Sequence, residues 1–374
     1  MNRVSLLKKI LHLPADYWKY SPISMGSLKI YLIWFDSLGA KSSSLLIETP
    51  EIKILVDPGA AAMQPSYPLP PETKSRLRSI ALSCIKEASK RANAVFISHY
   101  HYDHHVLPQE ARNIYKGKKL WIKNPNIWIN HSQWKRARLF LEQLLGNKIS
   151  RFYVPAPGLK FEDPWEKFAF ASRKDYGPYN DRKRELLQKG RVWLKGLFKI
   201  WESGPWVNEK KLEQEGIQFA EDKIFQAGST RVRFTSALFH GVEYDRVGWV
   251  TAIVLERDGV KLIYTSDLQG PSIEDYAVWI AKENPQILIL DGPATYLLGY
   301  MVNKINLQRA VENALFILKN ISPSFFIYDH HLLRDSLYQE RVKDIYQYAQ
   351  TNNRNIITAA EWYGYKPLIS LLGK

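Results

Sequence analysis

Residues 94–105 read AVFISHYHYDHH and decide the fold, because an unbroken apolar run ends here in four histidines and an aspartate. Short apolar runs of this kind predict a buried strand. At the end of a strand, residues two apart point the same way, so His99 and His101 can share one metal ion. Once the chain turns, Asp103 and His104 can face a second ion. Imidazole and carboxylate ligands without thiolate suit Zn²⁺ in an open, catalytic geometry, with Fe and Mn as alternatives.

Three more places put a histidine or an aspartate directly after an apolar run. His240 follows TSALF, Asp267 follows KLIYTS, and His330 and His331 follow FFIYD. Each of these alone would be an ordinary turn or core residue. Seven of the nine histidines nevertheless lie at such strand ends, where a strand delivers its last side chains to one edge of a sheet. Together these positions predict a metal site at that edge.

The apolar pattern around these positions predicts two similar halves of a layered α/β protein. In the first half we expect strands within residues 29–57, a turn at 57–59, a helix over 73–92 and a strand over 94–98. In the second half we expect strands at 230–239, 249–257, 260–266, 286–291 and 325–329, with helices at about 304–319 and near 335–350. Residues 256–261, ERDGVK, are typical of a hairpin turn. Each half therefore begins with antiparallel strands and continues with alternating strands and helices.

Residues 155–215 fit neither half and are interpreted as an insertion rich in Trp, Lys, Gly and Pro. Its clearest element is a helix near 182–202 with one apolar face and one basic face. Such a helix can contact an anionic surface. It can also pack its apolar face on the body of its own protein, which we expect here. Lys195 and Lys199 on the basic face are candidates for substrate binding. The apolar face comprises Leu194, Leu197, Phe198 and Trp201.

The composition limits the class of protein to which the chain can belong. Its 374 residues are 45% hydrophobic and 24% charged, which excludes a disordered, collagenous or coiled-coil chain. A single cysteine, Cys84, excludes a disulfide framework and a metal cage of thiolates. No apolar run is long enough to span a membrane, and the basic N-terminus is a poor signal peptide. We therefore expect a cytoplasmic protein.

Most of the net charge of +15 lies in one stretch of the chain. Residues 111–210 contain 22 lysines and arginines against 9 aspartates and glutamates, so the rest of the chain is nearly neutral. A localised basic field favours an anionic substrate or partner, such as a phosphorylated metabolite, nucleic acid or an acidic surface. The alternative is a solvated basic face without a specific partner.

Taken in chain order, the residues of the predicted site resemble the motif series of the metallo-β-lactamase superfamily. The series here is Asp57, then HYHYDH at 99–104, then His240, Asp267, and His330 or His331. The resemblance runs from about residue 32 to 359. The strings DSLGAKSS, VDPGAA, SHYHYDHH, SDLQGP and DHHLLRD are closer still to an uncharacterised archaeal branch of predicted metallo-hydrolases.

This resemblance implies an α/β fold, a four-layer αββα sandwich with a dinuclear metal site along one edge. Residues 1–374 would form a single domain. Residues 1–27 would be an N-terminal extension, and residues 155–215 would be a basic, partly helical insertion between the two halves.

The resemblance also implies two divalent metal ions per chain, with zinc expected, and a ligand set for each. The first ion would be held by His99, His101 and His240, the second by Asp103, His104 and His330, and both by Asp267. His331 is the alternative to His330 as the terminal ligand. Asp103 has a second candidate role, in which it orients or deprotonates the bridging water.

Three further residues would support these ligands from behind, namely Asp57, His105 and His331. Asp57 would hydrogen-bond a ligand histidine and so fix the orientation of its ring. The alternative for Asp57 is a plain Asp-Pro-Gly turn residue.

These features predict a metal-dependent hydrolase in which a dinuclear site activates water. The leading substrate is a phosphoester, with phosphodiesters of nucleic acids or nucleotides included, because the basic stretch attracts phosphate. Hydrolysis of a small thioester, lactone or amide is the alternative. From another class, a binding or scaffold protein that contains metal without catalysis is a further alternative, and redox di-iron chemistry ranks lowest. The chain contains no G-x-S-x-G, Walker A or G-x-G-x-x-G string, which counts against serine hydrolases and nucleotide-binding folds.

Overall fold

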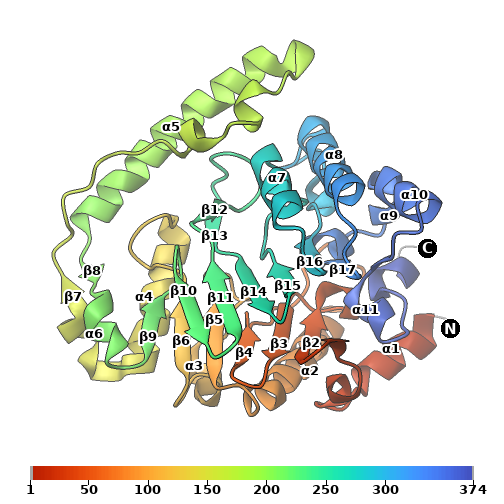
Figure 1. The fold of residues 1–374 in the computed structure, drawn as a ribbon, viewed down its shortest axis with the longest axis horizontal. Helices are drawn as coiled ribbons and strands as arrows, with labels where there is room; N and C mark the ends of the chain where they lie inside the picture. Colours follow the sequence, from red (N-terminus) through yellow and green to blue (C-terminus); the bar gives the residue numbers. More distant parts are fainter. Residues whose placement is uncertain (1–2, 373–374) are drawn as a thin grey trace.

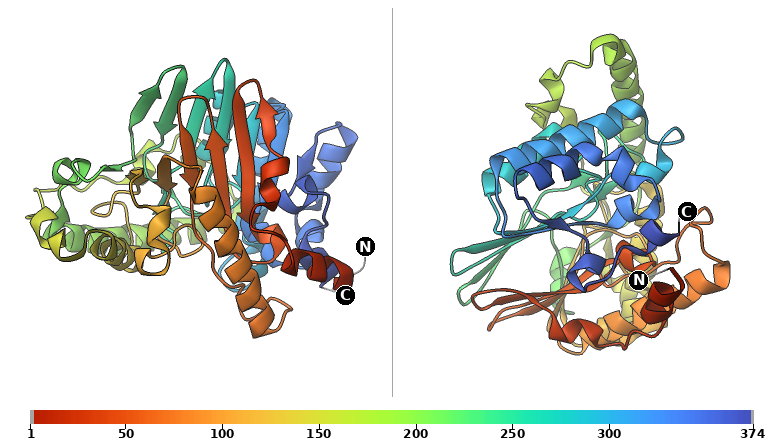
Figure 2. Two further views of the ribbon diagram at one scale, coloured as in Figure 1. Left: turned by 90° about the horizontal axis from the view of Figure 1, so that it is seen from below. Right: turned by 90° about the vertical axis from the view of Figure 1, so that its right-hand side faces the viewer.

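Two seven-stranded sheets lie face to face between two layers of helices in the computed structural model, which describes residues 3–372. The right-hand view in Figure 2 shows both sheets from the side, with blue helices above them and orange to red helices below. This arrangement confirms the predicted αββα sandwich.

The first sheet begins with antiparallel strands and continues with parallel ones. Its strand order is β1-β2-β3-β4-β5-β6-β9, in which β1 to β4 pair antiparallel and β4, β5, β6 and β9 pair parallel. The strand β1 comes from the predicted N-terminal extension. The bounds are β1 (Ile23–Met25), β2 (Leu28–Phe35), β3 (Ser43–Glu48), β4 (Lys53–Val56), β5 (Ala94–Ile97), β6 (Lys119–Ile122) and β9 (Ile217–Phe219).

The second sheet repeats this plan, as the sequence pattern predicts. Its order is β10-β11-β14-β15-β16-β17-β18, antiparallel from β10 to β15 and parallel from β15 to β18. The bounds are β10 (Ile224–Ala227), β11 (Thr230–Phe234), β14 (Ile253–Arg257), β15 (Val260–Tyr264), β16 (Ile287–Asp291), β17 (Phe325–Asp329) and β18 (Ile356–Ile357).

Alternation along the strands separates two apolar regions. In β3, Leu45 and Ile47 lie in the core between the sheets, whereas Leu46 lies in the core beneath the helices. In β14, Ile253 faces the other sheet and Val254 faces the helices. Successive strand residues point to opposite faces, so both faces of each sheet are buried, and the strands read as continuous apolar runs.

Helices cover the outer face of each sheet (Figure 1). The first sheet carries α2 (Pro71–Ser89), α3 (Pro108–Ala111) and α4 (His131–Leu145). The second carries α7 (Glu274–Glu283), α8 (Lys304–Asn320) and α10 (Lys343–Thr351), with α8 packed against both α7 and α10. Within residues 3–372, no helix is both long enough and apolar enough to cross a membrane.

Two predicted strands and one predicted helix are interrupted. The expected strand at 230–239 ends at Phe234 and resumes as β12 (Leu238–Phe239), and the one at 249–257 is divided into β13 (Trp249–Val250) and β14. The Thr235 hydroxyl accepts a hydrogen bond from Ala252 N at 3.0 Å, while Thr235 N donates to the carbonyl of Ala252 at 3.1 Å, so a side chain takes the place of one of the two backbone bonds there. β12 and β13 then pair with each other, outside the large sheets. The helix expected near 335–350 is broken at Val342 into α9 (Tyr338–Arg341) and α10.

The insertion leaves the body between two short strands. β7 (Tyr153–Val154) pairs with β8 (Trp206–Val207), and the chain between them contains α5 (Asn180–Ser203), which arches away from the sheets in Figure 1. Leu194, Leu197, Phe198 and Trp201 of α5 are buried, as expected for packing on the protein's own body. The Trp201 ring contacts Trp128 and Trp249 of the body.

A buried ion network ties α5 to the loop after β12. The Glu243 carboxylate binds Lys183 of α5 at 2.5 Å and Arg309 of α8 at 2.6 Å, and Arg309 also binds Glu274 of α7 at 2.7 Å. Burial alone would raise the pKa of Glu243, but Arg309 and Lys183 outweigh it and lower the pKa from 4.5 to about 2. The insertion is therefore held to the body by charge as well as by apolar packing.

Substitution of Glu243 by Gln is expected to destabilise the protein by about 3–5 kcal/mol, because Arg309 and Lys183 lose a buried counter-charge. Urea denaturation at pH 7 measures this cost. A group with a lowered folded pKa stabilises the protein above its unfolded pKa, so the difference between wild type and variant should shrink as the pH falls from 4.5 towards 2. Glu185→Gln, which breaks an exposed pair with Arg182 on the same helix, is the control and should change little. Equal stabilities of the two variants would contradict the role of the network.

Candidate metal centre

The carboxyl ends of several strands deliver the predicted site residues to one edge of the sandwich. His99 follows β5, His240 follows β12, Asp267 follows β15, and His330 follows β17. Asp57 follows β4, next to β5 in the same sheet. Because neighbouring parallel strands end at the same edge, side chains more than 200 positions apart along the chain meet there.

One group of side chains consists of His99, His101, His240 and Asp267, whose ligand atoms all lie within 4.8 Å of one another. His99 Nε2 lies 2.9 Å from His101 Nδ1 and 3.5 Å from Asp267 Oδ2. His240 Nε2 lies 3.1 Å from the same carboxylate oxygen. These are the residues that the sequence assigned to a first metal ion.

A second group consists of Asp103, His104 and His330. His104 Nε2 and His330 Nε2 are 3.2 Å apart, and His330 Nε2 is 3.9 Å from Asp103 Oδ2. His331 lies outside this group but forms a third candidate set with Asp267 and His330, and its Nε2 is 3.9 Å from Asp267 Oδ2. The structure thus places His330, rather than His331, beside Asp103 and His104.

The carboxylate of Asp267 lies between the two groups. Its Oδ2 is 3.1 Å from His104 Nε2, and its Oδ1 is 3.4 Å from His330 Nε2. Both oxygens of Asp267 and Nε2 of His240 are buried, and none of them has a hydrogen-bond partner among residues 3–372. Unpaired buried polar atoms are costly, and a carboxylate surrounded by ring nitrogens suits divalent cations. The residues present therefore fit divalent metal ions.

The protonation of the two groups differs. Burial and the neighbouring His104 lower the pKa of His99 well below its usual value, so that its ring is neutral and ready to bind a metal ion. Burial would lower the pKa of His104 too, but Asp267 and Asp57 outweigh it and raise the pKa to about 10. A metal ion that binds at the second group must therefore displace a proton from His104.

Asp57 holds His104 from behind with a fully buried carboxylate. It accepts hydrogen bonds from His104 Nδ1 at 2.8 Å, from Ser98 N and Oγ at 2.7 and 2.6 Å, and from the Tyr264 hydroxyl at 2.7 Å. The backbone of Asp57 has a φ of 45°, a left-handed conformation that few non-glycine residues adopt. The Nδ1–H of His104 is therefore held towards Asp57, which directs Nε2 at the other ligand atoms.

Two further carboxylates, which the sequence analysis did not single out, support histidines in the same way. Asp36, just after β2, accepts from His330 Nδ1 at 3.0 Å, and Asp291, at the end of β16, accepts from His331 Nδ1 at 2.9 Å. Burial and the nearby Asp267 raise the pKa of Asp291 to about 8. Both aspartates stand at strand ends, the signal that identified the candidate ligands.

Arg334 connects Asp103 of the second group with Asp36, the carboxylate that supports His330. Its Nη2 donates to Asp103 Oδ2 at 2.9 Å and its Nε donates to Asp36 Oδ2 at 2.5 Å. The guanidinium is buried and lies 3.3 Å from His330 Nε2 through Nη2. Arg334 therefore fixes Asp103 and, through Asp36, the His330 ring.

Gly59 allows the loop after β4 to pack against residues 98–105, the histidine loop that follows β5. A Cβ atom at this position would lie 2.3 Å from His105 N and 2.4 Å from His104 N. These are backbone atoms that cannot move aside, so only glycine permits this contact.

The predicted supporting residue His105 lies beside the site, where it contacts the backbone of His101. His105 donates from Nδ1 to the carbonyl of His101 at 2.9 Å, and burial lowers its pKa to about 4. Its ring packs between Tyr100, Tyr102 and Phe140.

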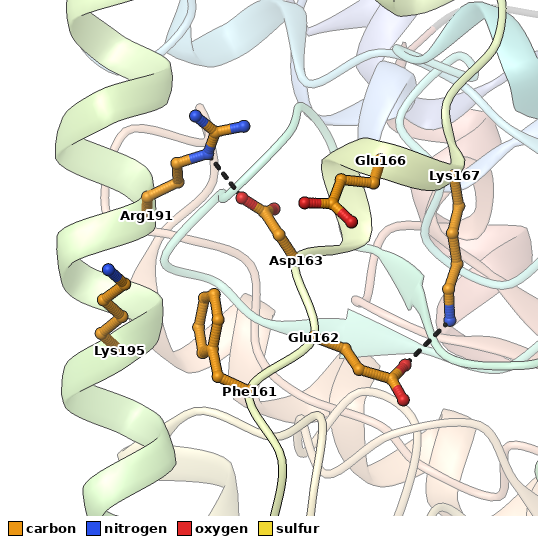
Figure 3. Close-up of a pocket in the computed structure, with 7 residues that line it drawn as sticks. All are labelled: Phe161, Glu162, Asp163, Glu166, Lys167, Arg191 and Lys195. Atoms are coloured by element: carbon orange, nitrogen blue, oxygen red, sulfur yellow. Dashed lines mark hydrogen bonds and ion pairs between the residues drawn. The ribbon is translucent and has the colours of Figure 1, made fainter.

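The candidate substrate-binding lysines lie on α5. Lys195 sits beside the ring of Phe161 in a cavity of about 490 Å³ that also contains Glu162, Asp163 and Glu166 (Figure 3). The acids balance the nearby bases, so this cavity has little preference for an anion. Lys199 is exposed on the same helix. Neither lysine is among the groups that could hold a metal ion.

A larger cavity, of about 670 Å³, lies between α5 and the loop that begins directly after His240. Lys189 of α5 and Arg246 of the loop line it, and neither side chain forms an ion pair with another residue in the part of the chain that the structure describes. Trp193 and Tyr300 line the same cavity. The carboxylates of Glu243 and Asp245 line it too, so this cavity also contains acids as well as bases.

No family model matches the chain. Similar solved structures include the metallo-β-lactamase fold protein YhfI from Bacillus subtilis, 14% identical over 87% of this chain and 93% of that protein, with a TM-score of 0.36. Unliganded yeast PDE1 is 10% identical over 89% and 96%, with a TM-score of 0.41. The assignment of the fold itself rests on the layers and strand order described above.

Several archaeal proteins are similar to this chain along nearly their whole length. A UPF0282 protein of Korarchaeum cryptofilum is 27% identical over 349 residues, which cover 93% of this chain and 93% of the relative. A UPF0282 protein of Methanopyrus kandleri is 30% identical over 350 residues, which cover 90% of this chain and 94% of the relative. At this identity and coverage, the chain belongs to the UPF0282 family.

Proposed function

We propose that this protein is a metal-dependent hydrolase with a dinuclear site, and that its substrate is a phosphoester. The observation that carries the proposal is the carboxylate of Asp267, which is buried without a hydrogen-bond partner among the described residues and lies between two groups of candidate ligands. Two divalent cations held side by side would activate water and stabilise the charge that develops on the attacked group.

Each group has a definite part in this proposal. His99, His101 and His240 would hold one cation and Asp103, His104 and His330 the other, with Asp267 shared. Arg334 would keep Asp103 in place, so that one oxygen of Asp103 could accept a proton from water or orient it. His104 and then Arg334 keep the pKa of Asp103 well below its usual range against the effect of burial, so this residue stays ionised.

The surroundings of the site favour an anionic substrate. Arg334 lies between the second group and Asp36, and the cavity beside the His240 loop carries the unpaired cations Lys189 and Arg246. The net charge of +13 over residues 111–210 adds a wider basic field. A phosphoester benefits from these charges, whereas a neutral thioester or lactone does not.

Asp267→Asn tests the shared carboxylate, because it keeps the shape of the side chain and removes its charge. We expect the metal content to fall from about two equivalents to one or fewer, and hydrolysis of bis(p-nitrophenyl) phosphate to fall to background. Elemental analysis and a colorimetric assay measure the two effects. Asp258→Asn, at the exposed hairpin before the same strand, is the matched control. Full activity of Asp267→Asn would exclude the bridging role.

The two terminal histidines should behave differently. His330→Ala is expected to lose one metal equivalent, because His330 Nε2 lies within the second group. His331→Ala should retain both equivalents, since Asp291 holds this ring through Nδ1 and its Nε2 lies 3.9 Å from the Asp267 carboxylate, against 3.4 Å for His330 Nε2. Elemental analysis of the two variants, purified without chelator, distinguishes them. The reverse result would exchange the two assignments.

Asp57→Asn should weaken metal binding by about 10–100-fold, because the amide is a poorer acceptor for the His104 ring N–H. Competition with a chromophoric chelator measures the affinity. Asparagine tolerates the left-handed backbone at this position. Asp222→Asn, at another aspartate with positive φ (59°) on the surface, controls for the backbone. Unchanged affinity in Asp57→Asn would reduce Asp57 to a turn residue.

A further inference from the structure

Lys41 lies on a segment that is fixed to the metal centre from two sides. Its neighbour Ser42 accepts a hydrogen bond from His330 Nδ1 through its carbonyl at 3.1 Å. Lys41 itself pairs with Ala61 through two backbone hydrogen bonds of 2.9 Å. Ala61 follows Gly59, which packs against the backbone of the histidine loop. The half-buried side chain of Lys41 therefore starts beside the second group of candidate ligands.

The charges around Lys41 are not balanced. Arg334 is paired with Asp36 and Asp103, and the ammonium of Lys74 donates to the carbonyls of Gln64 and Pro65 at 2.9 Å each. Lys41, by contrast, forms no side-chain hydrogen bond or ion pair with any residue between 3 and 372. Burial lowers the pKa of Lys41, and repulsion from Arg334 lowers it further.

An anion would relieve the repulsion among the cations around Lys41. Arg334 and Lys74 are close enough to lower its pKa, and the nearby carboxylates of Asp36 and Asp103 are both paired with Arg334. Divalent cations at the candidate site would add to the positive charge beside Lys41. Like charges at short range in a partly desolvated site repel strongly, and a multiply charged anion relieves that repulsion.

We infer that Lys41 binds a phosphoryl oxygen of the substrate beside the second metal group. This inference rests on the proposed function and names the residue that selects its substrate class. A lysine ammonium is a compact point charge that suits a phosphoryl oxygen. Arg334 already donates to Asp36 and Asp103, whereas the Lys41 ammonium donates to no residue between 3 and 372 and is free for a ligand.

Isothermal titration of the metal-loaded protein with inorganic phosphate tests the inference. We compare wild type with Lys41→Met, which keeps an apolar stem, and Lys41→Arg, which keeps the charge. Lys29→Met is the matched control, because Lys29 is exposed near the opposite end of β2 from the site. Each variant is also analysed for metal content and melting temperature. If Lys41→Met does not fold, Lys41→Gln takes its place.

Phosphate should bind Lys41→Met about tenfold more weakly than wild type. Lys41→Arg should stay within about threefold of wild type, and Lys29→Met should be unchanged. Equal affinity of Lys41→Met and Lys29→Met, with metal content intact, would overturn the role of Lys41 and leave the hydrolase proposal standing. Wild-type protein that takes up no metal would instead overturn the proposed function. Acetate is titrated in parallel. Acetate binding that weakens as much as phosphate binding would overturn the assignment to a phosphoryl group and point to a carboxylate.

Discussion

The carboxylate of Asp57 lies in the interior of the sandwich, where an ionised group is stable only if hydrogen bonds replace its lost water. Four donors meet this requirement, and they come from different parts of the fold. Ser98 follows β5 in the first sheet, Tyr264 ends β15 in the second, and His104 belongs to the histidine loop. One buried charge therefore joins both sheets at the edge and sets the direction in which a candidate ligand points. The remaining candidate ligands keep their positions only while these hydrogen bonds hold the two sheets together at this edge.

The same principle is repeated around the site with other carboxylates. Asp36 supports His330 and Asp291 supports His331, each through the ring nitrogen that faces away from the candidate metal positions. Arg334 then forms ion pairs with both Asp36 and Asp103. One cation thus connects Asp36, which supports a candidate ligand, with Asp103, which is itself a candidate ligand. A site built in this way is already arranged before a metal ion or a substrate arrives, which lowers the cost of ordering on binding.

The sequence was most informative where chemistry and secondary structure coincide. An apolar run followed at once by His or Asp predicted the strand ends, the order of the two halves and the residues that gather at one edge. It was least informative for residues whose hydrogen-bond partner lies far away along the chain. Asp36 and His330 are separated by 294 positions, and the residues around Asp36 do not indicate that it binds a histidine. Lys41 escaped notice for a related reason, since its unbalanced charge becomes visible only when Arg334 and Lys74 are placed beside it. At the break after Phe234, the Thr235 hydroxyl accepts a hydrogen bond from Ala252 N, which hydrophobic periodicity does not encode.

The ion network at Glu243 has an evolutionary consequence. Lys183, Glu243, Glu274 and Arg309 come from the insertion, the loop after His240, and two helices of the second sheet. Loss of one member leaves its partner buried without a counter-charge, which lowers stability. Exchange of the whole set for apolar residues can leave stability unchanged. The insertion and the loop after His240 are therefore coupled energetically, and we expect a change of charge in one to require a matching change in the other.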